Sequence, residues 1–164
     1  MKKMKRILAV ILTAVFAFLM LTACSDGGAE PAKNDYGKMI ESAMNAARRE
    51  YSLPDVKFEA SLESCAKNEA NHSVNGWQYA EVGGKKYKIK HIDSGTIMEK
   101  GMTFETWKRK FEGYIKSSQS STLGATFHGV ADKDLTYIGL WTSVSNGQVS
   151  YCIVGAFPEV CIIT

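Results

Sequence analysis

The chain has 164 residues, of which 23% are charged and 45% hydrophobic, and its formal net charge is +3. This length is enough for one domain with a hydrophobic core. The positive charge does not point to a nucleic-acid partner: without the four basic residues of segment 1–23 the net charge is −1, and no basic stripe remains.

The first 23 residues have the three parts of a secretory signal. The basic start consists of Lys2, Lys3, Lys5 and Arg6. Residues 7–23 carry no charge, are almost wholly apolar and end in small side chains. About twenty apolar residues would also cross a bilayer, so an uncleaved anchor helix is the alternative. In either case we expect the rest of the chain to be exported.

The sequence LTAC at residues 21–24 resembles the lipobox of bacterial lipoproteins. The resemblance implies cleavage before Cys24 and lipidation of this residue, which would anchor the protein to the exterior face of the cell membrane. We therefore expect a lipoprotein signal peptide at 1–23, a flexible tether at 24–35 and a single domain at 36–164. The tether is rich in Ser, Gly, Asp, Pro and Lys, as flexible linkers are.

Three cysteines follow Cys24, namely Cys65, Cys152 and Cys161. An odd number cannot all pair within one chain, which argues against a disulfide framework. Cys65 and Cys152 fall in apolar patterns, where a free cysteine behaves as a small buried hydrophobe. A disulfide between Cys152 and Cys161 is possible if the C-terminal tail folds back toward Cys152.

Three segments carry apolar residues at the spacing of an amphipathic helix. They are residues 36–51, residues 62–70 and a segment that begins near Thr103. In the third, one side is formed by Phe104, Trp107, Phe111, Tyr114 and Ile115. The sequence therefore predicts three helices.

Polar and proline residues indicate where these helices begin and end. Asn34 or Asp35 can cap the start of the first, and Pro54 lies beyond its end. The polar run KSSQSS at 116–121 is expected to stop the third.

The period of the pattern changes near the C-terminus. Two runs rich in Tyr, Ile, Val, Trp and Thr, within 135–157, flank Asn146 and Gly147. Asn-Gly supplies the positive φ angles of a tight β-hairpin turn. Another strand is expected at 85–93, where apolar residues alternate with lysines. Helices first and an antiparallel hairpin last predict an α+β domain.

Several short motifs, in this order, resemble the CAP superfamily in its bacterial, SCP-like form. This domain is shared by cysteine-rich secretory proteins, antigen 5 and pathogenesis-related protein 1. The motif residues are Asn45, Arg48, Leu53, Pro54, Val56, Phe58, Leu62, Ala66 and Ala70, followed by the closing YIGLW and YCIVGAF. The resemblance implies an α-β-α sandwich, in which helices flank a small, mainly antiparallel sheet.

CAP proteins typically line a cavity with two histidines and two acidic residues that can hold a divalent cation. By this resemblance, the candidate cavity residues are His72, Thr96 and His128. His72 resembles the first histidine, but the position of the acidic residue in Gly-Glu-Asn-Ile falls on Thr96. The run at 116–121 offers only serines where the second histidine is expected, and His128 lies further along.

This degenerate motif predicts no cofactor and no tight zinc or copper site, because one imidazole and neutral hydroxyls are a poor ligand set. His72 and His128 can equally be surface or hydrogen-bonded histidines, and His91 is expected to face solvent. Glu99 and Glu112 lie near the motif but match none of its positions.

The sequence also argues against an enzyme. It contains no Gly-x-Ser-x-Gly and no His-Glu-x-x-His motif. Cys65 is expected to face the core, and Asp132 with Asp134 to form a polar turn rather than a catalytic pair. The alternative is a hydrolase or a metal-dependent enzyme that uses His72 with nearby acidic residues.

We therefore expect a surface module that binds a small molecule, a lipid or a protein, as CAP domains do. Trp77 and Tyr79, in the Gly-rich stretch 75–84, form a candidate binding loop, although Trp77 can instead cover a core edge. A transporter-associated substrate-binding lipoprotein usually has two lobes, and roughly 130 residues allow only one.

Overall fold

The computed structural model describes residues 33–72, 78–120 and 129–159. The helices are α2 (Lys33–Glu50), α3 (Glu63–His72) and α4 (Phe104–Ser120), with short 3-10 turns η1 (Ala60–Leu62), η2 (Glu99–Gly101) and η3 (Gly129–Ala131). The strands are β1 (Lys57–Phe58), β2 (Gln78–Val82), β3 (Lys85–Met98), β4 (Tyr137–Ser145) and β5 (Gln148–Pro158). The predicted α+β class is therefore confirmed.

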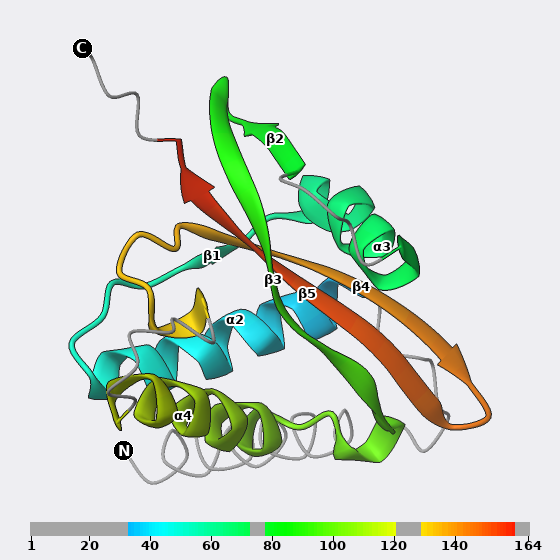
Figure 1. Ribbon diagram of the computed structural model, residues 1–164. Coiled ribbons are helices and arrows are strands. Elements are labelled where there is room, and N and C mark those ends of the chain that lie inside the picture. Colours follow the sequence, from blue (N-terminus) through cyan, green and yellow to red (C-terminus); the bar gives the residue numbers. More distant parts are fainter. Residues whose placement is uncertain (1–32, 73–77, 121–128, 160–164) are drawn as a thin grey trace, which may run out of the picture. The chain divides into compact units, whose positions relative to one another are not determined.

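The strands form one sheet in the order β1-β4-β5-β3-β2 (Figure 1). The short β1 runs parallel to β4, and the other neighbours are antiparallel. Among the described residues the sheet is thus mainly antiparallel, as expected.

Helices lie against both faces of this sheet. Successive side chains of a strand point to opposite faces, so each face has its own set of side chains for a helix to cover. On β5, Tyr151 and Ile153 pack with residues of α2 and α4, and we call this side the closed face. Cys152 and Val154 point the other way and pack with Leu62 and Ala66 of η1 and α3, and we call this side the open face. The three layers form the predicted α-β-α sandwich.

Helix α2 ends as the sequence predicts but does not begin as predicted. Ser52 has φ of 57°, and the N–H of Leu53 donates to the carbonyl of Arg48 at 3.0 Å. This left-handed C-terminal turn directs the chain toward Pro54 and ends the helix at Glu50.

Asn34 and Asp35 already lie within α2, so the expectation that one of them caps its start is wrong. Asp35 instead occupies the first turn of the described helix. A carboxylate in the first turn interacts favourably with the positive end of the helix dipole. This interaction does not require Asp35 to be the N-cap residue.

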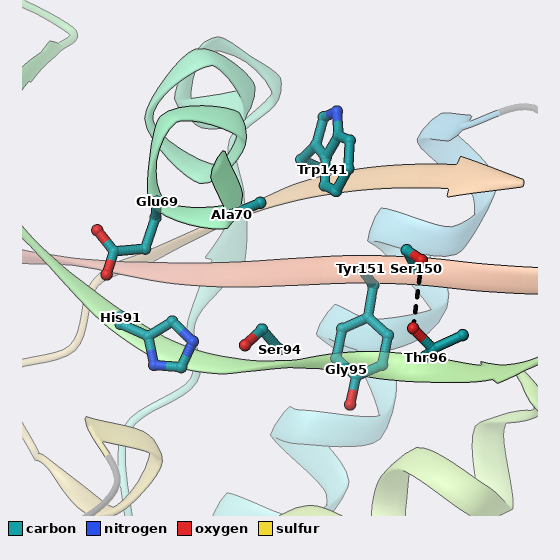
Figure 2. Close-up of a pocket in the computed structure, with 9 residues that line it drawn as sticks. All are labelled: Glu69, Ala70, His91, Ser94, Gly95, Thr96, Trp141, Ser150 and Tyr151. Atoms are coloured by element: carbon teal, nitrogen blue, oxygen red, sulfur yellow. Dashed lines mark hydrogen bonds between the residues drawn. The ribbon is translucent and has the colours of Figure 1, made fainter. Parts of the chain in front are cut away.

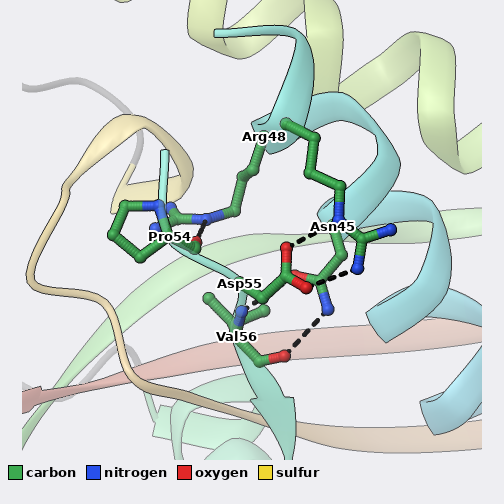
Figure 3. Close-up of polar contacts among 6 residues, drawn as sticks. Asn45, Arg48, Pro54, Asp55 and Val56 are labelled. Atoms are coloured by element: carbon green, nitrogen blue, oxygen red, sulfur yellow. Dashed lines mark hydrogen bonds and ion pairs between the residues drawn. The ribbon is translucent and has the colours of Figure 1, made fainter. Parts of the chain in front are cut away.

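Asn45 holds β1 against α2. Its Nδ2 donates to the carbonyl of Val56 at 2.9 Å, and its Oδ1 accepts from the Val56 N–H at 2.8 Å (Figure 3). The side chain is 6% exposed. A buried amide that satisfies both backbone groups of one residue fixes the position at which the chain enters β1.

Arg48 connects α2 to two loops. It is fully buried, and its guanidinium donates to the carbonyls of Pro54 at 2.7 Å, Val130 at 2.5 Å and Asp132 at 3.0 Å. Burial lowers the pKa of Arg48, and the nearby carboxylate of Asp132 opposes this shift. The Asn-x-x-Arg motif therefore has a structural role, which is to fasten the Leu-Pro turn and η3 to the first helix.

Helix α4 begins close to Thr103, as predicted, but extends further than predicted. The N–H of Thr106 donates to Oγ1 of Thr103 at 3.2 Å, which is N-cap geometry. The helix continues through the serine run to Ser120. Hydroxyls of Ser117 and Ser118 donate to carbonyls four residues back at 2.8 and 2.9 Å, so these serines satisfy the helix instead of stopping it.

The hairpin turn predicted between β4 and β5 is confirmed, with φ of 53° at Asn146 and 69° at Gly147. A second tight turn, at Gly83 and Gly84 with φ of 57° and 75°, joins β2 to β3. The stretch 75–84, which the sequence predicts to be a Gly-rich loop, thus contains strand β2. Strand β3 also runs beyond residue 93, because its C-terminal part pairs with the first half of β5.

Candidate functional site

The open face carries an open surface pocket of about 550 Å³ between α3 and the strands β3, β4 and β5. Nine residues line it: Glu69, Ala70, His91, Ser94, Gly95, Thr96, Trp141, Ser150 and Tyr151 (Figure 2). It exists because α3 is short and the β4–β5 hairpin runs on past it (Figure 1). Its volume is within the range of small-molecule sites.

A β-bulge in β3 supplies three of the polar side chains. His91 pairs with Val154, but the next pair along the strand joins Asp93 to Ile153, so Ile92 is an extra residue. His91 and Ser94 consequently share the open face although they are three residues apart. Thr96 follows on the same side.

A buried polar network on the closed face lies directly behind this bulge. Asp93 is 8% exposed and accepts hydrogen bonds from the hydroxyls of Tyr114 and Tyr151, both at 2.9 Å. Nζ of Lys110 lies 2.6 Å from Oδ2 of Asp93 and also contacts the Tyr151 hydroxyl. A buried carboxylate needs such partners, and these partners fasten the bulge to α4 and β5.

Desolvation and the Asp93 charge raise the pKa of both tyrosines. The side chain of Tyr151 points to the opposite side of the sheet from Trp141 (Figure 2). Its hydroxyl is therefore part of the network behind the pocket and does not face a ligand on the open face.

Two hydrogen bonds orient polar groups of the pocket itself. Nε2 of Gln78, on β2, donates to Oε2 of Glu69 on α3 at 3.1 Å. Oγ1 of Thr96 and Oγ of Ser150 lie 3.2 Å apart on adjacent strands. Glu69 and the two hydroxyls are thus held in place before any ligand arrives.

Trp141 is the large aromatic side chain on this side of the pocket. It is half-buried on β4 and packs against the open-face cluster that contains Leu62 and Cys152. In Figure 2 it stands on the same side of the sheet as Ser150 and Ala70. The pocket therefore combines one broad apolar surface with hydroxyl, imidazole and carboxylate groups.

The structure describes only some of the site residues that the sequence predicts. Thr96 lines the pocket, and His72 is the last residue of α3, although its side chain lies outside the described part. His128 and Trp77 also lie outside the described residues, as does Cys24.

Tyr79 lies in β2 and not in a loop. It is 45% exposed and pairs with Lys88. The Nζ of Lys86 lies 4.4 Å from the centre of its ring. Since Gln78 reaches Glu69 and neighbouring strand residues alternate, Tyr79 is directed to the sheet face away from the pocket.

Sequence reasoning missed Glu69, Trp141 and Ser150, and it treated His91 as an ordinary solvent-facing residue. His91 is indeed exposed, but it lines the pocket. In the sequence, His91 and Ser150 look like the polar side of any half-exposed strand, and Glu69 looks like any polar residue of a helix. A Gly-Gly turn signal at Gly83 could have revealed β2, and with it the position of Gln78 near α3.

The described thiols are poorly suited to nucleophilic chemistry. Cys65 and Cys152 are free, and burial raises the pKa of both, that of Cys152 to about 12. A thiolate is the reactive form, so this shift suppresses reactivity at neutral pH. Cys161, the other half of the possible bridge, lies outside the described residues.

Carboxylates do not gather around a possible metal or substrate position. In residues 33–72, 78–120 and 129–159, no group of three His, Cys, Asp or Glu side chains could hold a metal ion. The N–H of Asp134 donates to Oδ1 of Asp132 at 2.9 Å, which is the predicted polar turn before β4.

None of the helices within the described ranges is both long and apolar enough to cross a membrane.

No protein-family model matches the sequence, and no curated protein matches it. Among solved structures, the chain is similar to hookworm platelet inhibitor, with 11% identity and a TM-score of 0.46 over 81% of this chain and 74% of that one. It is also similar to MpPR-1i, with 14% identity and a TM-score of 0.46 over 80% of this chain and 93% of that one.

Proposed function

We propose that this protein is an exported, lipid-anchored binding protein whose CAP-like domain holds a ligand in the open-face pocket without chemical conversion. The observation that carries the proposal is the pocket of about 550 Å³ on a sheet face that α3 covers only in part. Gln78 orients Glu69, and the hydroxyls of Thr96 and Ser150 orient each other, which lowers the entropic cost of binding.

The CAP-like assignment draws support from the ordered motifs and from the sandwich itself. Asn45 and Arg48 fasten the Leu-Pro turn, and the Asn146-Gly147 hairpin forms the centre of the same sheet. Motif residues that are buried and hydrogen-bonded belong to a shared scaffold, so they bear on fold and not on activity.

A binding role is favoured over catalysis by the chemistry of the described groups. The thiols have raised pKa values, and the two aspartates near β4 belong to a turn. Glu69 is the one carboxylate among the described residues that line the pocket, whereas general acid–base hydrolysis usually employs two positioned groups.

Ligand binding is tested by thermal unfolding of the protein in the presence of soluble metabolites, short peptides or lipid vesicles. A compound that binds the folded domain raises the midpoint temperature of unfolding. A ligand at 100 times its Kd stabilises a protein by about 2.7 kcal/mol. We expect a stabilising compound to lose its effect in Ser94→Phe, which fills the pocket, and to keep it in Ser64→Phe, an exposed position on α3 outside the lining. Equal responses of both variants, or no response at all, would contradict the proposal.

The lipid anchor is tested separately through Cys24. Cys24→Ala should abolish incorporation of labelled palmitate in a bacterial host and leave the uncleaved precursor in the membrane fraction, because no thiol remains for lipidation. Ser25→Ala is the matched control and should be labelled normally. Labelling that persists in Cys24→Ala would contradict the anchor.

A further inference from the structure

We propose that the ligand of the open-face pocket is an uncharged carbohydrate, bound as a short oligosaccharide with one sugar ring against Trp141. This inference rests on the proposed binding function and adds the chemical class of the ligand. It follows from three properties of the pocket: an aromatic surface, a set of hydroxyl-type partners and the sign of its charge.

The aromatic surface is the side chain of Trp141. A pyranose ring has one face made of C–H groups, which packs against an indole ring, while its edge carries hydroxyls. Trp141 is half-buried, so its ring is held by the packing of the open-face cluster while part of it faces the pocket. A large and rigid aromatic surface gives contact area at a small cost in conformational entropy.

The polar partners match sugar hydroxyls, each of which is both a donor and an acceptor. Ser94, Thr96 and Ser150 present hydroxyl groups with the same dual capacity. Glu69 adds an acceptor that Gln78 holds in place at 3.1 Å. These groups lie on α3, β3 and β5, beside the strand β4 that carries Trp141 (Figure 2).

The charge of the pocket argues against acidic ligands. Among the nine described residues that line it there is no lysine or arginine, and Glu69 is the one acid. A phosphate or a uronic acid would therefore meet the Glu69 carboxylate with no lysine or arginine in the described lining to compensate its charge. Lipid tails fit poorly as well, because serine, threonine, histidine and glutamate form most of the lining and apolar ligands prefer a mainly apolar cavity.

The decisive experiment is calorimetric titration and saturation-transfer NMR on the full chain, purified in a detergent without a sugar headgroup. The probes are neutral trisaccharides of glucose, mannose, galactose and N-acetylglucosamine. A trisaccharide of galacturonic acid, a neutral pentapeptide and phosphatidylglycerol vesicles serve as the other ligand classes. We expect at least one neutral trisaccharide to bind, with the strongest transfer to the C–H protons of one ring face.

Variants of two residues assign the site. Trp141→Ala should weaken this binding at least tenfold and Trp141→Phe less, because phenylalanine keeps an aromatic surface. Glu69→Gln should weaken it about tenfold, as expected for loss of a hydrogen bond to a charged group. Circular dichroism of each variant checks that the domain is folded, and Ser64→Ala is the control outside the pocket.

Each other outcome overturns part of the inference. Sugar binding that is unchanged in both Trp141→Ala and Glu69→Gln places the site elsewhere. Binding of the peptide, the vesicles or the acidic sugar, lost in Ser94→Phe while neutral sugars do not bind, refutes the carbohydrate class and leaves the proposed binding function standing. Absence of binding by every probe, together with no response in the metabolite screen, refutes both.

Discussion

The two faces of the sheet differ in how completely helices cover them. On the closed face, α2 and α4 bury a continuous cluster in which Trp107, Phe111 and Ile115 are at most 1% exposed. On the open face, the short α3 buries a smaller cluster and leaves hydroxyls exposed beside Trp141. The comparison indicates that one face carries the stability of the domain, which frees the other face to present polar groups to a ligand.

The largest difference in the free energy of unfolding is expected between two tryptophan-to-alanine substitutions, Trp107→Ala on the closed face and Trp141→Ala on the open face. Trp107 is 1% exposed, and its ring stacks on that of Phe111. It also meets the ring of Tyr151 edge-on, with 4.8 Å between the ring centroids. Trp107→Ala should lower the free energy of unfolding by about 3–5 kcal/mol, the usual loss for a large buried aromatic side chain.

Trp141→Ala should lower it by less than half as much, because that side chain is already half in water. Urea unfolding followed by circular dichroism measures both values. Equal losses would show that the open face is as important for stability as the closed face, and the comparison would fail.

Two neighbouring residues of β5 give the next test. Tyr151, on the closed face, donates to the buried Asp93, while Ser150 on the open face contacts an exposed hydroxyl. Tyr151→Phe should lower the free energy of unfolding at pH 8 by about 1.5–3 kcal/mol, as for hydrogen bonds to charged groups. Ser150→Ala should have a much smaller effect.

The same pair has a characteristic pH dependence. Because the pKa of Tyr151 is raised in the folded protein, the unfolded chain releases this proton first, above its ordinary pKa near 10. The contribution of Tyr151 is therefore complete below pH 10 and decreases as pH rises further. The difference between the wild type and Tyr151→Phe should shrink from pH 10 to about pH 11. A difference that grows with pH would show that this hydroxyl is not held neutral by its surroundings.

The last comparison concerns two glycines, one packed against η1 and one on the exposed side of α4. A Cβ at Gly139 would lie 2.4 Å from Cβ of Leu62, whereas a Cβ at Gly113 on α4 would meet nothing within 4 Å. Gly139→Ala should destabilise the domain by about 1–3 kcal/mol, because η1 and α3 must move away from β4.

Gly113→Ala should stabilise the domain by about 0.5–1 kcal/mol, since alanine has the higher helix propensity. Thermal unfolding of both variants measures these shifts. If Gly139→Ala has no effect, α3 is not packed tightly on the open face, and the pocket is less well defined than the contacts of Leu62 indicate.

Local chemistry was sufficient for the elements that the sequence predicted correctly. Asn146-Gly147 favours a tight hairpin turn because both residues tolerate positive φ and strand-like runs flank them. Thr103 caps a helix through a bond to a residue three positions away. The serine run 116–121 misled the prediction, because serine hydroxyls stabilise a helix end when they bond back to carbonyls within the helix.

By itself the sequence determined the three amphipathic helices, the central hairpin and the α+β class. Each of these depends on periodicity, on a turn or on a motif that neighbouring residues define. The tertiary structure alone decided that Glu69, His91 and Trp141 line one pocket, and that Asp93 fastens the bulge behind them. The physical reason is that strand register and helix length set these contacts, and polar residues on a half-exposed strand look alike in a sequence whether they border a pocket or open water.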